Sequence, residues 1–462
     1  MSHSHGYIRD GKDFGSVWAS PGSRTGHANQ LDVILAAILL GPMTVLQIAG
    51  RTPALFWVDI VVALLAGTAG LKALLRPNGL RVPNVTVWAL MYLSIAFASL
   101  TLTTDPLAGV ALFKLRVMPI AVFLLACALT RDRNDIDHFF ASLIVFGSVL
   151  AVISLYNWYE FSKGILTLSA EFGPKDMLQS SFGRSNFLAS IFIIVIPICI
   201  PYISGHGKRG QALLFGGGLF LMLAALMFTQ SRGALISLVV GMIAWVCIAL
   251  AQSFTIRKVT IAVAIAVGIP LGIALVWPAI PENVRVGLDT AFGVLFAQVK
   301  GGNFGGDRTD QWVAALRGAW SSHLLGIGLG NQIPFYIRLG LTPSAHSVYL
   351  ETLLETGLLG LLALLGTLYG FGITLKRIWR DCPRQDRLLA GALIASFVTA
   401  LVNVAQETSF WAAQYSYLFW MMMGVAYSWR RLETHRNTEL GHTHRYFREP
   451  EAAPLNESHS KF

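Results

Sequence analysis

The protein has 462 residues, of which 54% are hydrophobic and 13% are charged, and its formal net charge is +10. A soluble domain would carry about 25% charged residues, so this composition excludes both a soluble globular enzyme and a disordered protein. Because a membrane-spanning helix needs about 20 apolar residues, the chain is long enough for roughly a dozen spans.

Apolar runs of spanning length predict an all-α, polytopic membrane protein with about twelve transmembrane helices. No removable signal peptide is expected in the polar segment 1–30, because no short apolar stretch precedes a small-residue cleavage site. A transmembrane domain at 31–429 is then followed by a polar tail at 430–462. The expected spans are 31–49, 54–75, 84–103, 107–129, 139–159, 186–204, 211–228, 233–251, 259–277, 346–374, 388–405 and 411–429.

The distribution of Lys and Arg predicts the orientation. With twelve spans both termini lie on one side, and the loops on that side all carry Lys or Arg, whereas the four short loops opposite carry only Arg51 and Arg232. Since basic loops stay in the cytoplasm, both tails are expected there. This bias accounts for the basic net charge without any nucleic-acid partner.

Two expected outer loops are long, at 160–185 and 278–345. The second contains two helical stretches, Asn283 to Val299 and Thr309 to His323, separated by a glycine-rich hinge. Loops of this length are usually functional or disordered. We expect the second loop to form a partly helical cap on the outer face.

Lys114 and Arg116 fall inside the expected span 107–129, roughly 10 Å and 13 Å from its outer end at about 1.5 Å per residue. Charges at this depth are costly without a partner. Two interpretations remain open. The two cations either pair with intramembrane carboxylates such as Glu351 or Glu355, or form a cationic wall that binds an anionic lipid headgroup.

Two further arginines occur in expected outer segments. Arg232, in FTQSRGALIS, lies at a short turn where Ser231 can cap a helix and Gly233 lets a ligand approach the backbone. A guanidinium beside a helix N-terminus suits a phosphate, although Arg232 could also extend toward lipid headgroups. Arg308, in GGDRTDQW, opens the expected cap helix and would by itself be an ordinary surface residue.

His346 occurs in LTPSAHSVYLETLLETG. Thr342 followed by Pro343 predicts a helix start, which places His346 in the second helical turn. Histidine suits proton transfer near neutral pH, but a lone histidine there is also common as an interfacial hydrogen-bonding residue. Glu351, five residues further on, is rotated by about 140° on the same helix and is not expected to be its partner.

Several chemistries lack their signatures. The outer loops contain no His/Cys cluster, HExxH, paired aspartates or calcium loop, so a metal-free site is expected. The chain has no GxSxG elbow, P-loop or dinucleotide fingerprint, which argues against a serine hydrolase, an NTP-driven pump or a redox enzyme. No cofactor is therefore expected.

Four segments together resemble the O-antigen ligase and O-antigen polymerase superfamily of bacterial envelope glycosyltransferases. They are FGRSNFLASIFIIVIPI, FTQSRGALISLVVG, GIGLGNQIPF and AHSVYLETLLETGLLG, within roughly residues 181 to 375. The resemblance implies a metal-independent enzyme of the bacterial inner membrane whose active site faces the periplasm. Its donor would be a glycan on undecaprenyl pyrophosphate, and its acceptor a lipid A core sugar or another glycan.

Carried over by motif position, the resemblance makes Arg232 and Arg308 ligands of the pyrophosphate and His346 the catalytic residue beside the acceptor hydroxyl. Arg184 would be a weaker candidate for the same anionic pocket. Arginines can neutralise a departing pyrophosphate in place of a metal, and single displacement would invert the anomeric carbon. The open lipid-headgroup interpretation of Lys114 and Arg116 places these two in the same group of candidate substrate-binding residues.

Three activities stay open. A ligase that transfers glycan to lipid A core is favoured, because the chain has a single large cap with one histidine block. The first long loop, 160–185, also has only 26 residues and a net charge of zero. A polymerase of O-antigen or exopolysaccharide is the alternative, since the motifs are shared. A transporter of lipid-linked sugars is the third; its support is the charged residues at membrane depth, whereas the clustering of candidates on one face argues against it.

Overall fold

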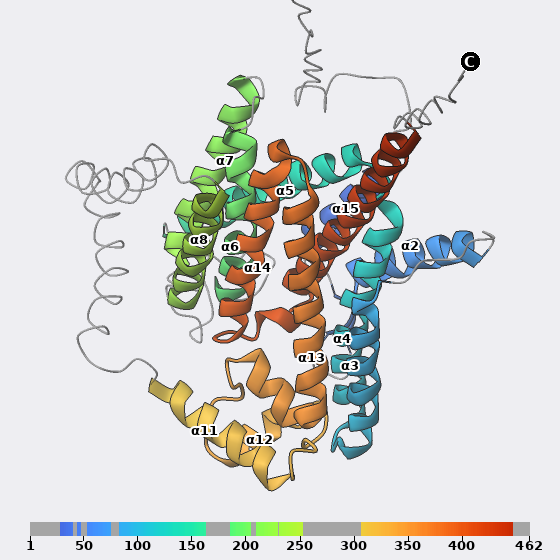
Figure 1. Ribbon diagram of the computed structural model, residues 1–462. Coiled ribbons are helices and arrows are strands. Elements are labelled where there is room, and N and C mark those ends of the chain that lie inside the picture. Colours follow the sequence, from blue (N-terminus) through green and yellow to red (C-terminus); the bar gives the residue numbers. More distant parts are fainter. Residues whose placement is uncertain are drawn as a thin grey trace, which may run out of the picture.

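The computed structural model describes residues 28–39, 44–47, 53–74, 83–162, 185–204, 209–229, 231–252 and 306–446. These residues are helices and connecting turns, apart from one short antiparallel pair of strands, β1 (Thr44–Gln47) and β2 (Pro53–Phe56). The predicted all-α class is thus confirmed, with this small hairpin as an addition. Figure 1 shows the long helices packed side by side as a bundle.

The helices follow one another with short connections over most of the described chain. They are α1 (Ala28–Leu39), α2 (Trp57–Leu74), α3 (Val85–Ser99), α4 (Pro106–Leu129), α5 (Arg133–Ser162), α6 (Ser185–Ser204), α7 (Arg209–Phe228), α8 (Arg232–Gln252), α11 (Gly306–Ser321), α12 (Gln332–Arg338), α13 (Val348–Asp381), α14 (Arg387–Val404) and α15 (Ala413–Tyr446).

Seven segments of the described chain are long and apolar enough to cross a membrane. They are Val85–Leu102, Pro106–Leu129, Arg133–Glu160, Ser185–Ser204, Gly210–Phe228, Val348–Asp381 and Arg384–Val404, and shorter apolar helices lie at Gln30–Leu39, Val58–Thr68 and Arg232–Ile248. The protein is therefore a multi-pass membrane protein, but the predicted count of twelve spans is not confirmed. The expected span 259–277, the expected helix 283–299 and most of the loop 160–185 lie outside the described residues.

The helix α13 is broken at Gly357, whose backbone has φ 72° and ψ −171°. Beside the break, the Leu354 and Glu355 carbonyls accept hydrogen bonds from the amides of Ile327 (2.8 Å) and Gly328 (3.0 Å). Buried carbonyls need such partners, because an unpaired one costs as much as a lost hydrogen bond. The loop before α12 therefore supplies the hydrogen bonds that the break requires.

Glycine is required in this loop because the two chain segments touch. Gly326 and Gly328 have φ of 90° and 97°, in the left-handed region that glycine adopts readily. A Cβ on Gly326 would lie 2.5 Å from the Glu355 carbonyl oxygen, and one on Gly328 would lie 2.9 Å from the backbone of Leu102. The glycines of the GIGLG motif thus allow the loop to pack closely between α13 and the turn that joins α3 to α4.

Asn331 fastens the end of this loop to the same α3–α4 turn. Its Nδ2 donates to the Leu102 carbonyl (2.9 Å), and its Oδ1 accepts from the amide and the hydroxyl of Thr104 (3.0 and 2.7 Å). Figure 1 shows α11 and α12 at the end of the bundle where α13 begins. A small core formed by Ala314, Ala315, Tyr336, Ala345 and Leu354 joins them to α13.

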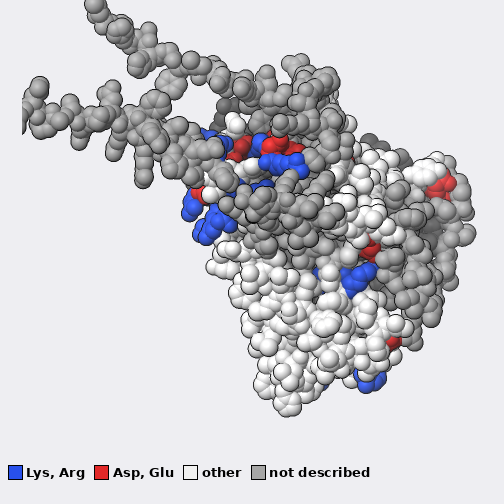
Figure 2. Space-filling model, turned by 90° about the vertical axis from the view of Figure 1, so that its right-hand side faces the viewer, with Lys and Arg blue, Asp and Glu red and all other residues white. Residues whose placement is uncertain are grey.

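Charge is distributed unevenly between the two ends of the bundle. Figure 2 shows Lys and Arg gathered mainly in the upper part of this face, whereas the part below is mostly uncharged, with a few separate charged groups toward its right-hand side. The helical cap and the basic surface therefore lie at opposite ends of the described bundle. That the cap faces the periplasm stays a prediction from the Lys and Arg bias.

The break in α13 provides a stability test. We expect Gly357→Ala to lower the free energy of unfolding by about 1–3 kcal/mol, because alanine is strained at positive φ. Its Cβ would also clash with the Leu324 carbonyl oxygen. Gly372→Ala, in the same helix, is the control, since its Cβ would lie 3.5 Å from Phe397. Thermal unfolding in detergent measures both, and equal Tm values for the two variants would contradict the role of Gly357.

Candidate active site

The segment that carries His346 is not helical. The expected helix start at Thr342 and Pro343 is wrong, because α13 begins only at Val348. The Thr342 hydroxyl, which would cap the expected helix, instead accepts a hydrogen bond from Gln311 of α11. A tertiary contact with the cap thus overrides the local helix signal.

His346 itself has an unusual backbone conformation, with φ of 48°. For a residue with a side chain this region costs about 1–3 kcal/mol and persists only where surrounding contacts impose it. Two contacts do so: the His346 amide donates to the Ser344 hydroxyl (3.0 Å), and Trp312 of α11 donates to the Ala345 carbonyl (2.8 Å). The cap helix therefore sets the direction of the imidazole.

A buried carboxylate, Glu407, lies at the centre of the site. It occupies the turn between α14 and α15, and its side chain is only 4% exposed. One oxygen, Oε1, accepts from Asn186 Nδ2 of α6 (2.8 Å) and from Arg308 Nη2 of α11 (3.0 Å). The other, Oε2, lies 3.9 Å from His346 Nδ1. Residues from distant parts of the sequence thus meet at one carboxylate.

Buried hydroxyl and amide groups hold the turn that carries Glu407. Asn403 Nδ2, at the end of α14, donates to Ser190 Oγ of α6 (2.8 Å) and to Ser409 Oγ (3.2 Å). Ser190 Oγ donates in turn to Ser409 Oγ (2.9 Å). These three side chains are fully buried, and hydrogen bonds between buried polar groups are strengthened by the low local dielectric. Glu407 is therefore presented by a fixed turn.

Both predicted arginine ligands lie beside this turn. Arg308 donates through Nη1 to the Gln406 carbonyl (3.1 Å), and its side chain remains 37% exposed. Arg232 is the first residue of α8 and is half-buried. A Cβ on its neighbour Gly233 would lie 3.2 Å from Gln406 Oε1, so the start of α8 packs directly on the turn. Within the described chain, no carboxylate lies at ion-pair distance from Arg232.

Lys114 and Arg116 contact different partners. Arg116 Nη2 lies 3.6 Å from Glu355 Oε2, both side chains are buried, and the guanidinium lies 3.8 Å from the centre of the Trp411 ring. Lys114 Nζ lies 2.6 Å from the Asp59 carboxylate. Of the two interpretations left open for these cations, the structure therefore has carboxylate pairing, with Glu355 for Arg116 and Asp59 for Lys114.

The structure thus brings His346, Arg308 and Arg232 to one turn, while Arg116 lies behind that turn against Trp411. Arg184 lies outside the described residues. Glu351 accepts a hydrogen bond from Ser344 (3.1 Å) and does not pair with His346. In the described part of the chain, no group of three or more His, Cys, Asp or Glu residues is placed to hold a metal ion.

Glu407 and Asn186 are not predicted from the sequence. The available signal was a single acidic residue in AQETSF, between two apolar runs, where an unpaired carboxylate would be costly. Its partners are 221, 99 and 61 positions away in the sequence, and no local pattern connects them.

Comparison with known proteins shows a similarity to one protein family. Residues 217–365 match the family model described as O-Antigen ligase. The match covers about a third of the chain, and this region is similar to the O-antigen ligase and polymerase family. No curated protein sequence matches the chain. The matched segment contains Arg232, Arg308 and His346, whereas Glu407 and Asn186 lie outside it. This similarity supports a glycosyltransferase of the O-antigen ligase and polymerase type, a class that acts on lipid-linked glycans.

The role of Glu407 in holding the site has a measurable consequence. We expect Glu407→Ala to lower the Tm of the purified protein clearly, because Asn186 and Arg308 lose an acceptor that is inaccessible to water. Asp381→Asn is the matched control, since it removes a carboxylate from an ion pair with the largely exposed Arg380. Thermal unfolding compares the two variants, and a Glu407→Ala protein as stable as Asp381→Asn would show that the carboxylate does not hold the turn.

Proposed function

We propose that the protein transfers a glycan from undecaprenyl pyrophosphate to a sugar hydroxyl of lipid A core, at the periplasmic face of the bacterial inner membrane. The observation that carries this proposal is the placement of His346 and Arg308 on the two oxygens of one buried carboxylate, Glu407. The family similarity and the position of the cap at one end of the bundle support it further.

Arg308 and Arg232 are the proposed ligands of the pyrophosphate. Arg308 is fixed by Glu407 and the Gln406 carbonyl, yet its guanidinium keeps donors on its exposed part. Arg232 is half-buried beside the same turn. Guanidinium groups bind phosphate oxygens through paired hydrogen bonds, and two of them stabilise the negative charge that builds up as the pyrophosphate departs. This step needs no nucleotide and no metal ion.

His346 is the proposed base. Glu407 Oε2 lies 3.9 Å from Nδ1, which is too far for a hydrogen bond, so in this proposal the carboxylate acts through its charge and stabilises the imidazolium that forms. The Nε2 atom is then available for the acceptor hydroxyl. The acceptor oxygen attacks the anomeric carbon, the bond from that carbon to the phosphate oxygen breaks, and the hydroxyl proton moves to His346. The pyrophosphate leaves on its lipid, and the anomeric configuration is inverted.

Glu407 acts in this scheme as a positioning residue. It contacts Arg308 on the donor side and His346 on the acceptor side, so one carboxylate sets the separation of the two groups. Trp312 contributes by holding the backbone next to His346. Correct separation matters because a misplaced base or leaving-group ligand costs much of the gain from bringing the reactants together.

The base is tested by a transfer assay with purified protein, a defined lipid-linked glycan and lipid A core acceptor in detergent. We expect His346→Ala to abolish transfer, with at least a 100-fold loss that matches the usual contribution of a general base, while binding of the donor is retained. Wild-type protein with added chelator is the control and should keep its rate. Wild-type turnover by His346→Ala would remove histidine from the mechanism. A wild-type protein that consumes no lipid-linked glycan, with or without the lipid A core acceptor, would favour a transporter.

A deletion strain distinguishes the ligase from a polymerase, which shares the motifs and is the second candidate. For a ligase, we expect long lipid-linked polymer to accumulate while the lipid A core stays unmodified. For a polymerase, single repeats would still be found on the core. Mass analysis of the lipid fraction and the lipopolysaccharide, with a complemented strain as the control, gives either result.

A further inference from the structure

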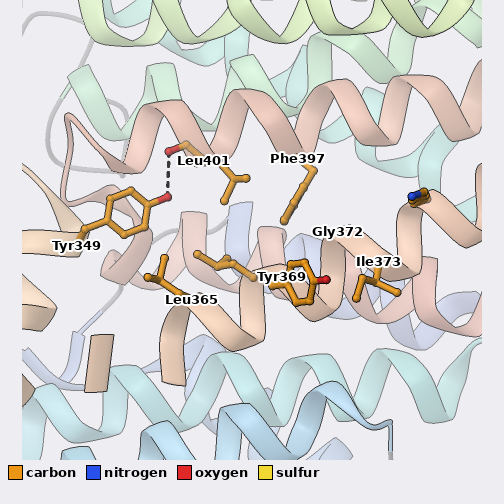
Figure 3. Close-up of a pocket in the computed structure, with 9 residues that line it drawn as sticks. Tyr349, Leu365, Tyr369, Gly372, Ile373, Phe397 and Leu401 are labelled. Carbon is orange, nitrogen blue, oxygen red and sulfur yellow. Dashed lines mark hydrogen bonds between the residues drawn. The ribbon is translucent and has the colours of Figure 1, made fainter. Parts of the chain in front are cut away.

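A groove runs between α13 and α14 on the outside of the bundle. Its cavity volume is about 450 Å³, which is within the ordinary range for ligand pockets. Figure 3 shows Leu365, Tyr369 and Ile373 of α13 along one side and Phe397 and Leu401 of α14 along the other. Apart from the Tyr hydroxyls, the groove is apolar until it reaches Lys376.

The two ends of the groove differ. At one end the Tyr349 hydroxyl donates to the Leu401 carbonyl (3.2 Å), which bridges α13 and α14, and His346 lies three positions before Tyr349. At the other end Lys376 contributes to the lining. The stretch of α13 from Leu365 to Lys376 is about 16 Å long at 1.5 Å per residue. This length matches about half of the 30 Å hydrocarbon core, which is the depth of one leaflet.

The Lys376 end is strongly cationic. Lys376, Arg377 and Arg380 are all exposed, and only Arg380 has a carboxylate, Asp381, at ion-pair distance within the described chain. Burial and the neighbouring charge of Arg377 lower the pKa of Arg430 in α15, so a further guanidinium faces this group. An anion placed here would relieve the repulsion between like charges.

We propose that this groove binds an anionic phospholipid from the leaflet opposite the His346 end, with one acyl chain between α13 and α14 and the phosphate at Lys376. The one-leaflet length fits an acyl chain that enters from the cationic side. The cationic end selects a negative headgroup, since each Lys or Arg near a lipid phosphate contributes about 1 kcal/mol. The headgroup end of the groove, at Lys376, lies opposite the candidate active site, and the proposal does not depend on the proposed function.

The test is native mass spectrometry of the full-length protein purified in mild detergent and supplied with phosphatidylglycerol or phosphatidylcholine. We expect the wild type to retain phosphatidylglycerol in preference to phosphatidylcholine. Lys376→Gln should reduce that retention about fivefold, the equivalent of one cationic contact. Arg384→Gln, which removes an exposed charge next to α14 but outside the groove, is the control and should retain lipid as the wild type does.

A second pair of variants tests the groove itself. Gly372→Leu fills the cavity and should abolish the preferential retention, while Gly217→Leu adds the same side chain to α7, where nothing lies within 4 Å, and should not. Equal retention of both lipids by all variants would overturn the proposal. Retention of polyprenyl diphosphate in place of phosphatidylglycerol, lost in Gly372→Leu, would assign the groove to the donor lipid and would overturn it as well. Neither readout requires transferase activity.

Discussion

The candidate active site depends on the burial of one negative charge, that of Glu407. A carboxylate removed from water is tolerated only with cationic or hydrogen-bonding partners, and breaking such a pair costs far more than the pair itself contributes. Asn186 and Arg308 are those partners, His346 lies 3.9 Å from the other carboxylate oxygen, and each of the three comes from a different part of the bundle. The need to compensate this charge therefore draws α6, α11 and the segment before α13 together.

A second buried carboxylate, Glu355, gives the neighbouring helix its shape. It accepts from the Gly330 amide (2.9 Å) and pairs with Arg116, next to the break at Gly357. Arg116 also lies against Trp411, which belongs to the turn that carries Glu407. The break in α13 and the active-site turn are thus joined through one guanidinium. A substitution of Glu355 or Glu407 is therefore expected to affect both the break in α13 and the active-site turn.

Patterns along the sequence predict the features that have a local cause. Apolar runs identify the seven segments of spanning length in the described chain. The grouping of Arg232, Arg308 and His346 is an expectation of the family resemblance, and all three lie beside the turn that carries Glu407. Glu407 is not predicted from the sequence, because the three residues around it are distant in sequence. The helix start at Thr342 is wrong because Gln311, on another helix, takes the capping hydroxyl. Contacts between residues distant in sequence determine both features, and local sequence propensities do not contain these contacts.

The arginines near this end of the bundle differ in how much of their charge the protein already neutralises. Arg116 is buried against Glu355 and Trp411, so its charge is already compensated within the protein. Arg308 shares Glu407 with Asn186 and is partly exposed, which leaves donors for a ligand. Arg232 has no carboxylate at ion-pair distance among the described residues, and a half-buried cation of this kind gains most from an incoming anion. Pairing, more than depth in the membrane, therefore separates the structural cations from the candidate phosphate ligands.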